Sequence, residues 1–375
     1  MCVSGLPGQA MPIGDNLNWS VLFVTGYAKK CRESYTGAFL TGHIMKLLST
    51  SLAGVLLSGC AMVPSGTPTA SILVDLDPAS VERTMIVEAI TADRTGVLYL
   101  PDRVSSSIVR VDPRAPKPVV VGKIEPRTVA GKKVEPMPGG IAFDAKGNLY
   151  VAAGPFAEVV RISAADLNAG RPGIAQTFVT GVPGANGIVF DKRGNLYVSG
   201  GASGVVYRVG EAGGAAQPVA QIEKNTRTLP DGKAQQAIVA NGIEFDAAGV
   251  LHIADTSRGA VWKVTLGADG KGSAPVLLAQ SPQLEGADGM AFSPNGDLWV
   301  TANELNAVVS VSPAGAVKTV ARNNAQGPLE FPSAVVFVGP RAYVSNFDVP
   351  RRDNMDANGT TAKDGIGASV AQIVP

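Results

Sequence analysis

Short runs of alternating apolar and polar residues recur along the chain after residue 70, each followed by a polar turn and a second apolar run. Because neighbouring side chains of a strand face opposite sides of a sheet, this alternation predicts β-strands. An Asp at the first and a Gly at the fourth turn position is typical of a type I turn. The clearest copies are GGIAFDAKGNLYV, NGIVFDKRGNLYV, NGIEFDAAGVLHI and DGMAFSPNGDLWV, flanked by the looser EAITADRTGVLYL and SAVVFVGPRAYV. The pattern predicts six copies of one β-hairpin.

The spacing of these hairpins predicts how they assemble. Successive copies begin 45 to 55 residues apart, and repeats of roughly 40–45 residues with several short strands are typical of propeller blades. No long stretch after residue 70 keeps an apolar period of 3.6 residues, and 44 glycines and 26 prolines interrupt the chain. We therefore expect an all-β fold, a six-bladed β-propeller of four-stranded antiparallel blades over residues 71–375. The C-terminal run 369–373 is expected to supply the last strand and to close the ring without a free edge.

The segment before the repeats has the composition of a targeting signal. Residues 45–60, MKLLSTSLAGVLLSGC, join one lysine to an apolar run that ends in Leu-Ser-Gly-Cys. These last four residues resemble the lipobox of bacterial lipoproteins, which implies cleavage before Cys60, lipidation of its thiol and stable membrane anchoring. Ala61 follows in place of the aspartate associated with inner-membrane retention, so the resemblance favours the outer membrane of a bacterial cell envelope, facing the periplasm. The alternative is a short buried apolar segment with an incidental cysteine.

Two further segments surround this signal. Residues 1–44 precede a complete signal with its own Met45 and match no repeat, so we expect an extension from a wrongly assigned start codon. The alternative is that Val21–Val24 and the following residues belong to an unusual anchor. Residues 61–70 are rich in Pro, Ser, Thr and Gly and are expected to form a tether between the lipid and the propeller.

Cysteine and charge usage narrow the classes of partner. Cleavage before Cys60 removes Cys2 and Cys31 and leaves no pair for a disulfide. The formal net charge is +1, without a Lys/Arg run or a basic stripe beside aromatic residues, so nucleic acid is not an expected partner. The sequence gives no indication of a protein partner.

One register of the repeat carries the candidate chemistry. Five positions before the first turn residue, successive copies have Glu88, Gly139, Asn186, Asn241, Asp288 and Ser333. The rest of each copy is apolar or turn-forming, so two carboxylates and two carboxamides at a single register indicate a metal site built by the ring. Since Asn-Gly and Asp-Gly pairs also form turns, a purely structural role for Asn186, Asn241 and Asp288 is the alternative.

This succession resembles the regucalcin/gluconolactonase family of sugar lactone lactonase-like proteins, over about residues 85–348. The resemblance implies a six-bladed propeller with one divalent cation at the top of the central channel. It also implies hydrolysis of a lactone or ester, with Asp288 as both metal ligand and general base. The ligands that it implies are Glu88, Asn186, Asn241 and Asp288.

The chemistry of these side chains agrees with a hard cation. Two carboxylates and two amide carbonyls form an all-oxygen site, which suits Ca²⁺, Mg²⁺ or Mn²⁺ better than the sulfur and imidazole sites of structural zinc. We expect one divalent cation, with Ca²⁺ the first choice and Mg²⁺, Mn²⁺ and Zn²⁺ as alternatives. The resulting hypothesis is a metal-dependent hydrolase of a small-molecule lactone or ester. The alternative is a non-catalytic, NHL-like propeller lipoprotein that serves as a binding or sensing platform.

Other candidate groups are weaker. Of the two histidines, His43 lies in the N-terminal extension, and His252 occupies a strand position that is Tyr or Trp in the sister copies, so we expect it to be packed. Gly184 stands where sugar-lactone members of the family often carry a substrate-contacting arginine. The long segment 223–239 precedes Asn241 and is expected to lie near the channel mouth.

A second calcium site is a weaker hypothesis still. Asn354–Gly359 imitates the start of an EF-hand loop, with oxygen-bearing side chains at alternate positions. Its twelfth position is Gly365, where a bidentate Glu is expected, so a flexible polar loop explains the segment as well.

Overall fold

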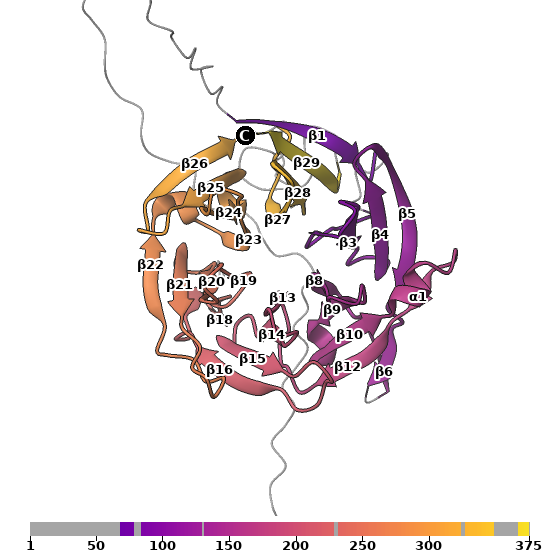
Figure 1. The fold of residues 1–375 in the computed structure, drawn as a ribbon, viewed down its shortest axis with the longest axis horizontal. Helices are drawn as coiled ribbons and strands as arrows, with labels where there is room; N and C mark the ends of the chain where they lie inside the picture. Colours follow the sequence, from indigo (N-terminus) through magenta and orange to yellow (C-terminus); the bar gives the residue numbers. More distant parts are fainter. Residues whose placement is uncertain are drawn as a thin grey trace, which may run out of the picture. The chain divides into compact units, whose positions relative to one another are not determined.

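The structure is a computed structural model that describes residues 68–78, 84–129, 131–228, 232–323, 327–348 and 367–374. These residues include six β-sheets of four or five strands that follow one another around a central axis as the blades of a propeller (Figure 1). The expected all-β, six-bladed fold is therefore confirmed. The expectations for residues 1–44, for the signal with Cys60 and for the loop Asn354–Gly359 fall outside the described residues.

The first three blades take most of the N-terminal half. Blade 1 contains β2 (Thr91–Ala92), β3 (Leu98–Pro101), β4 (Ser107–Asp112) and β5 (Ala115–Lys123), with β11 (Gly173–Ile174) parallel to β5. Blade 2 contains β8 (Pro138–Phe143), β9 (Leu149–Ala153), β10 (Glu158–Ile162) and β12 (Gln176–Thr180). Blade 3 contains β13 (Ile188–Phe190), β14 (Leu196–Ser199), β15 (Val205–Val209) and β16 (Gln217–Gln221).

The remaining blades repeat the same meander. Blade 4 contains β19 (Ile243–Phe245), β20 (Leu251–Asp255), β21 (Ala260–Val264) and β22 (Val276–Gln280). Blade 5 contains β23 (Ala287–Phe292), β24 (Leu298–Ala302), β25 (Ala307–Val311) and β26 (Val317–Arg322). Blade 6 contains β27 (Pro332–Val338), β28 (Arg341–Asn346), β29 (Ser369–Val374) and β1 (Thr69–Asp75).

Small elements lie in the connections between strands. Two hairpins pair β6 (Arg127–Val129) with β7 (Lys132–Val134) and β17 (Thr226–Thr228) with β18 (Ala234–Gln236). The helices are α1 (Ala164–Leu167) and the 3₁₀ turns η1 (Gly154–Phe156), η2 (Pro282–Leu284) and η3 (Asn303–Leu305). None of the helices in the described part of the chain has the length and apolarity needed to cross a membrane.

Ring closure differs from the expectation in one respect. The C-terminal strand β29 is the third strand of blade 6, and the outermost strand is β1, which pairs antiparallel with β29 from Thr69↔Val374 to Asp75↔Ser369. Both ends of the described chain therefore share one sheet, which leaves no unpaired strand between the first and last blades. β1 begins at Thr69, two residues before the expected start of the propeller.

The repeated turns have the expected geometry. In blade 2 the Gly147 amide donates to the Asp144 carbonyl at 3.1 Å, and Gly147 has a φ of +83°. The Asp144 carboxylate accepts from the Lys146 and Asn148 amides at 2.8 and 2.9 Å, so the side chain fixes the turn that the sequence predicts. These turns lie where the inner strand ends, which places the start of every inner strand at the opposite end of the ring.

Aromatic side chains join each blade to the next. An aromatic ring on the second strand of one blade meets an inner-strand Phe of the following blade edge to face, at centroid distances of 4.9 to 5.1 Å. The five pairs are Tyr99–Phe143, Tyr150–Phe190, Tyr197–Phe245, His252–Phe292 and Trp299–Phe337. His252 is thus a buried packing residue, as expected, and burial lowers the pKa of its imidazole. Between blades 6 and 1 the aromatic partner is missing, and Tyr343 packs in a cluster with Ala92 instead.

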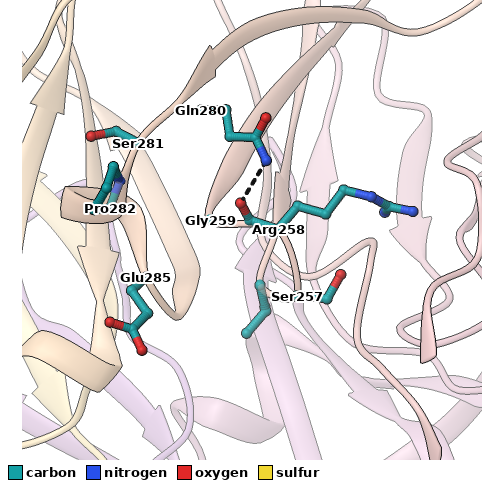
Figure 2. A pocket seen from close by; sticks show the side chains of 8 residues that line it. Ser257, Arg258, Gly259, Gln280, Ser281, Pro282 and Glu285 are labelled. Atoms are coloured by element: carbon teal, nitrogen blue, oxygen red, sulfur yellow. Dashed lines mark hydrogen bonds between the residues drawn. The ribbon is translucent and has the colours of Figure 1, made fainter. Parts of the chain in front are cut away.

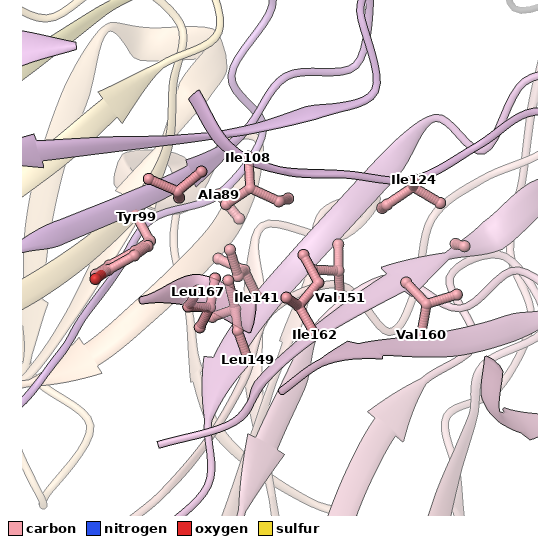
Figure 3. Close-up of a cluster of buried hydrophobic side chains, with 12 residues drawn as sticks. Ala89, Tyr99, Ile108, Ile124, Ile141, Leu149, Val151, Val160, Ile162 and Leu167 are labelled. Carbon is pink, nitrogen blue, oxygen red and sulfur yellow. The ribbon is translucent and has the colours of Figure 1, made fainter. Parts of the chain in front are cut away.

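Aliphatic side chains fill the rest of each interface. Between blades 1 and 2, buried residues from both sheets interdigitate (Figure 3). Blade 1 contributes Ala89, Tyr99 and Ile108, and blade 2 contributes Ile141, Leu149, Val151, Val160, Ile162 and Leu167. The hydrophobic core therefore consists of successive interfaces between neighbouring blades.

The inner strands approach one another closely near their starts. A Cβ on Gly187 would lie 2.6 Å from the Asn241 carbonyl oxygen of the next blade, and one on Gly289 would lie 2.6 Å from the Ser333 carbonyl oxygen. Neither glycine has a positive φ. Close approach of backbones is the reason for glycine at these two positions, so the structural alternative for the Asn-Gly and Asp-Gly pairs stands beside the metal-site prediction.

Gly187→Ala should destabilise the propeller by about 1–3 kcal/mol, because the added methyl group forces apart two inner strands. Gly210→Ala is the matched control, since a Cβ there would be 3.7 Å from its nearest neighbour, the Gly213 carbonyl. Urea unfolding of both variants measures the difference. Equal unfolding free energies would show that the inner strands can separate at no cost.

Candidate metal centre

The candidate ligands all lie at the starts of inner strands. Glu88 precedes β2, Asn186 precedes β13, Asn241 precedes β19, and Asp288 is the second residue of β23. Because the inner strands run in the same direction around the ring, these four side chains belong to one end of the propeller, opposite the Asp-x-x-Gly turns. We call this the site end.

Asp288 is at the centre of the group. Its side chain is buried, with 8% of the residue exposed, and the Asn303 amide nitrogen donates to its Oδ2 at 3.0 Å. Burial, followed by the negative charge of Glu88, raises the pKa of the Asp288 carboxyl well above its usual range. The Asn303 hydrogen bond, the Arg103 charge and a hydrogen bond from Asn241 oppose this rise. Glu88 and Asn241 are therefore near enough to influence the Asp288 carboxyl.

Glu88 forms an ion pair that the ligand register does not anticipate. Arg103 Nη1 donates to Glu88 Oε2 at 2.7 Å, with side-chain exposures of 23% and 14%. The guanidinium also lies over the Phe347 ring, 5.6 Å from its centroid. A protein-borne cation therefore occupies one oxygen of a predicted metal ligand.

Arg103 belongs to a second polar register that the sequence reasoning missed. In three blades the ligand side chain contacts the residue 15 positions later, just after the second strand. The pairs are Glu88–Arg103, Asn241–Thr256 and Asp288–Asn303. The constant spacing is the signal that could have identified these partners, although their side chains have no chemical property in common.

The other ligand candidate, Asn186, has a different environment. The residue 15 positions later is Gly201, which offers no side chain. A Cβ on Gly201 would be 4.0 Å from Asn186 Nδ2, and one on Gly139 would be 3.8 Å from Asn186 Oδ1. Glu88 and Asn241 both influence the pKa of the Asp288 carboxyl, whereas Asn186 is placed by its position in the ring. The roles of all four residues as ligands remain predictions.

The backbone at Gly184 favours glycine. Gly184 has a φ of +68°, a conformation that L side chains rarely adopt, and a Cβ there would lie 2.9 Å from the Gly200 carbonyl oxygen. An arginine at this position would be strained.

The segment 223–239 lies at the site end. Its described residues include the hairpin of β17 and β18, and Asn225 Nδ2 donates to Ser257 Oγ at 3.1 Å. The Ser257 amide in turn donates to the Ile238 carbonyl at 3.0 Å. The segment is thus attached to the loop that carries Thr256, the partner of Asn241.

A pocket of about 490 Å³ opens beside this loop, between blades 4 and 5 (Figure 2). In the wall of this pocket, Gln280 Nε2 donates a hydrogen bond to the Arg258 carbonyl at 3.1 Å. Its lining residues are Thr256, Ser257, Arg258, Gly259, Gln280, Ser281, Pro282 and Glu285. Thr256 is the wall residue that also contacts a candidate metal ligand.

The residues present fit a hard divalent cation. In the described ranges no cluster of three or more His, Cys, Asp and Glu side chains is found. The predicted ligand set would not form such a cluster, because two of its four members are amides. Beside them, the Asn303 Oδ1 atom is buried without a hydrogen-bond partner, in a residue that is 5% exposed. This oxygen belongs to the amide whose nitrogen donates to Asp288, and oxygen is the type of ligand atom that Ca²⁺ prefers.

The sequence of residues 88–345 matches the family model described as the SMP-30/gluconolactonase/LRE-like region. The chain belongs to this family. The match begins at Glu88, the first candidate ligand, and it spans all six inner strands. None of the curated proteins compared with the chain matches it.

Solved structures share the fold at low sequence identity. A gluconolactonase from Xanthomonas campestris has a TM-score of 0.58 and 14% identity, covering 82% of this chain and 90% of its own. A calcium-binding protein, regucalcin, from Agrobacterium tumefaciens has a TM-score of 0.53 and 16% identity, covering 82% and 93%. A virginiamycin B lyase from Staphylococcus aureus has a TM-score of 0.51 and 10% identity, covering 82% and 99%. Because one of these proteins is a lyase, the fold alone does not decide the chemistry.

Asp288→Asn should stabilise the cation-free protein at pH 7 by about 1 kcal/mol, because it removes a carboxylate whose charge is disfavoured by burial. The raised pKa means that the folded state keeps a proton that the unfolded state loses. The stability of the native protein therefore falls as pH rises above the usual Asp range, and the advantage of the variant should shrink as pH is lowered. Thermal unfolding of both proteins in EDTA, between about pH 4 and about pH 8, measures this difference in stability.

Asp255→Asn is the matched control and should have the opposite sign. Asp255 is fully buried and accepts from Arg258 Nη1 at 2.7 Å and from Ser257 Oγ at 2.7 Å. Removing its charge should cost about 1–3 kcal/mol. Destabilisation by both substitutions would contradict a disfavoured charge at Asp288.

Proposed function

We propose that the protein is a metal-dependent hydrolase of a small-molecule lactone or ester. The observation that carries this proposal is the convergence of Glu88, Asn241 and Asp288 at one end of the ring, beside the orphaned Asn303 oxygen. Membership of the SMP-30/gluconolactonase/LRE-like family supports it. The similarity to a regucalcin described as calcium-binding supports Ca²⁺ as the first choice, with Mg²⁺, Mn²⁺ and Zn²⁺ as alternatives.

The proposed roles follow from the side chains at the site end. Glu88, Asn186, Asn241 and Asp288 would hold the cation, which when bound would supply a Lewis acid for the substrate carbonyl and for water. Asp288 would also act as the general base, the role that membership of the family implies for this ligand. Asn303 holds Oδ2 of this carboxylate and so fixes its orientation.

A second candidate function is favoured by the Arg103 ion pair. A guanidinium already pairs with Glu88, so one of the two carboxylates of the ligand register has a positive partner without an added cation. A non-catalytic propeller that binds or senses a small molecule would not need a divalent cation. The two functions differ in whether the protein binds a divalent cation and hydrolyses an ester.

The decisive variant is Asp288→Ala in the full-length protein. After treatment with EDTA, titration with Ca²⁺, Mg²⁺, Mn²⁺ and Zn²⁺ should raise the melting temperature of the native protein. A cation at about 100 times its Kd adds about 2.7 kcal/mol to the stability. The variant should lose this response, and its kcat/KM for aryl esters or lactones should fall by at least about 10²-fold.

Asp297→Ala is the control for this test. Asp297 lies in the β23–β24 turn of the same blade, away from the site end. It should keep both the cation response and the activity. Absence of any cation response in the native protein, together with no hydrolysis, would leave the binding function instead.

We also propose that the protein is lipid-anchored through Cys60 in the cell envelope. The support is the sequence of residues 45–60. Cys60→Ala should move the protein from the membrane fraction to the soluble or precursor fraction in a bacterial host, because acyl chains provide the anchor. An unchanged distribution of the variant would contradict lipidation at this cysteine.

A further inference from the structure

We propose that Arg103 is an internal cation that competes with the divalent cation for Glu88 and thereby sets the cation affinity of the site. The inference rests on the proposed metal-dependent function. It concerns the second polar register, which neither the ligand pattern nor the family match assigns.

The distribution of charge at the site end is the first observation. The acidic residues of the ligand register are Glu88 and Asp288, and the register 15 positions later has Arg103 in blade 1 and the buried Asp348 in blade 6. In blades 4 and 5 the equivalent partners, Thr256 and Asn303, are neutral. Arg103 is therefore the one basic residue of the two registers, and it places a positive charge against Glu88, where a bound cation would need negative charge.

The backbone that carries Arg103 is firmly held. The Arg103 amide donates to the Ile86 carbonyl at 2.8 Å. The neighbouring carboxylate of Asp102 is buried and accepts from the Ile86 and Val104 amides, each at 3.0 Å. This network directs the Arg103 side chain to Glu88, and the Phe347 ring supports the guanidinium from one side.

Guanidinium and metal ion compete for the same oxygen. Arg103 Nη1 is 2.7 Å from Glu88 Oε2, whereas Ca²⁺ sits about 2.3–2.6 Å from its oxygen ligands. The neutral partner Asn303 has an amide oxygen, which is a possible metal ligand. A guanidinium has no acceptor atom and is positively charged, so it cannot bind a metal ion. Arg103 must therefore release Glu88 Oε2 if the cation is to bind this oxygen. Its side chain is 23% exposed, so it has access to solvent.

The test is calorimetric titration of CaCl₂ into EDTA-treated, full-length protein. Arg103→Gln and Arg103→Met should each lower the Kd for Ca²⁺ by about tenfold or more, because they remove the competing charge. Arg103→Met keeps an apolar side chain against Phe347 and so checks that the effect comes from the charge.

Arg114→Gln is the matched control. Arg114 is also in blade 1 and also pairs with an aspartate, Asp112, at 2.8 Å, but it is exposed on the surface. Its Kd for Ca²⁺ should remain within about twofold of the native value, since exposed charges are screened. A tenfold effect of this control would show that any positive charge on the blade acts, and would overturn the assignment to Arg103.

The outcomes separate the two proposals. If the native protein binds Ca²⁺ and the Arg103 variants bind it equally or more weakly, the competition is wrong and the metal site stands. If neither native protein nor variants bind any divalent cation, both proposals fail. A crystal structure of the calcium-saturated native protein needs no variant: a persistent Arg103–Glu88 contact beside bound Ca²⁺ would overturn the inference.

Discussion

The close approach of neighbouring inner strands is the constraint on which the site depends. At Gly187 and Gly289 there is no room for a Cβ, because the carbonyl of the next blade's register residue lies against the glycine. Hydroxyl groups reinforce the contact: Ser199 Oγ donates to the Asn241 carbonyl at 2.6 Å, and Thr301 Oγ1 donates to the Ser333 carbonyl at 3.1 Å. The candidate ligands are therefore held at one level by packing between blades. A site built in this way is preorganised by the fold itself and needs no ordering of a loop.

The sequence predicts most of this fold because the blades repeat. The turn residues, the aromatic position on the second strand and the glycine after the ligand recur with a nearly constant period, and each has a local physical cause. Ring closure by β1 could not be predicted in this way. The segment Thr69–Asp75 lies before the first copy of the repeat, and its pairing with β29 joins residues about 300 positions apart that match by shape and hydrogen bonding alone.

The candidate ligand register was predictable because the repeated phrases can be aligned. Asn186, Asn241 and Asp288 precede a glycine in similar phrases, so the register was visible in the sequence. The partners 15 residues later are an arginine, a threonine and an asparagine, which share a position but no chemistry. Their importance follows from contacts across the two strands of each hairpin, and a single sequence shows those contacts only once the strand register is known.

Charge compensation explains why the two registers belong together. Two carboxylates close to each other in a buried ring repel one another, and the repulsion contributes to the raised pKa of Asp288. The cation-free protein offsets this cost with the Arg103 guanidinium at Glu88 and with amide hydrogen bonds at Asp288. A bound divalent cation would offset the same cost more fully. The Arg103 guanidinium and a divalent cation would therefore each reduce the repulsion between the two carboxylates. The inner-strand glycines and the aromatic contacts are independent of this choice. On the proposal made for Arg103, substitution of this residue would alter the cation affinity of the site and would leave the packing between the blades unchanged.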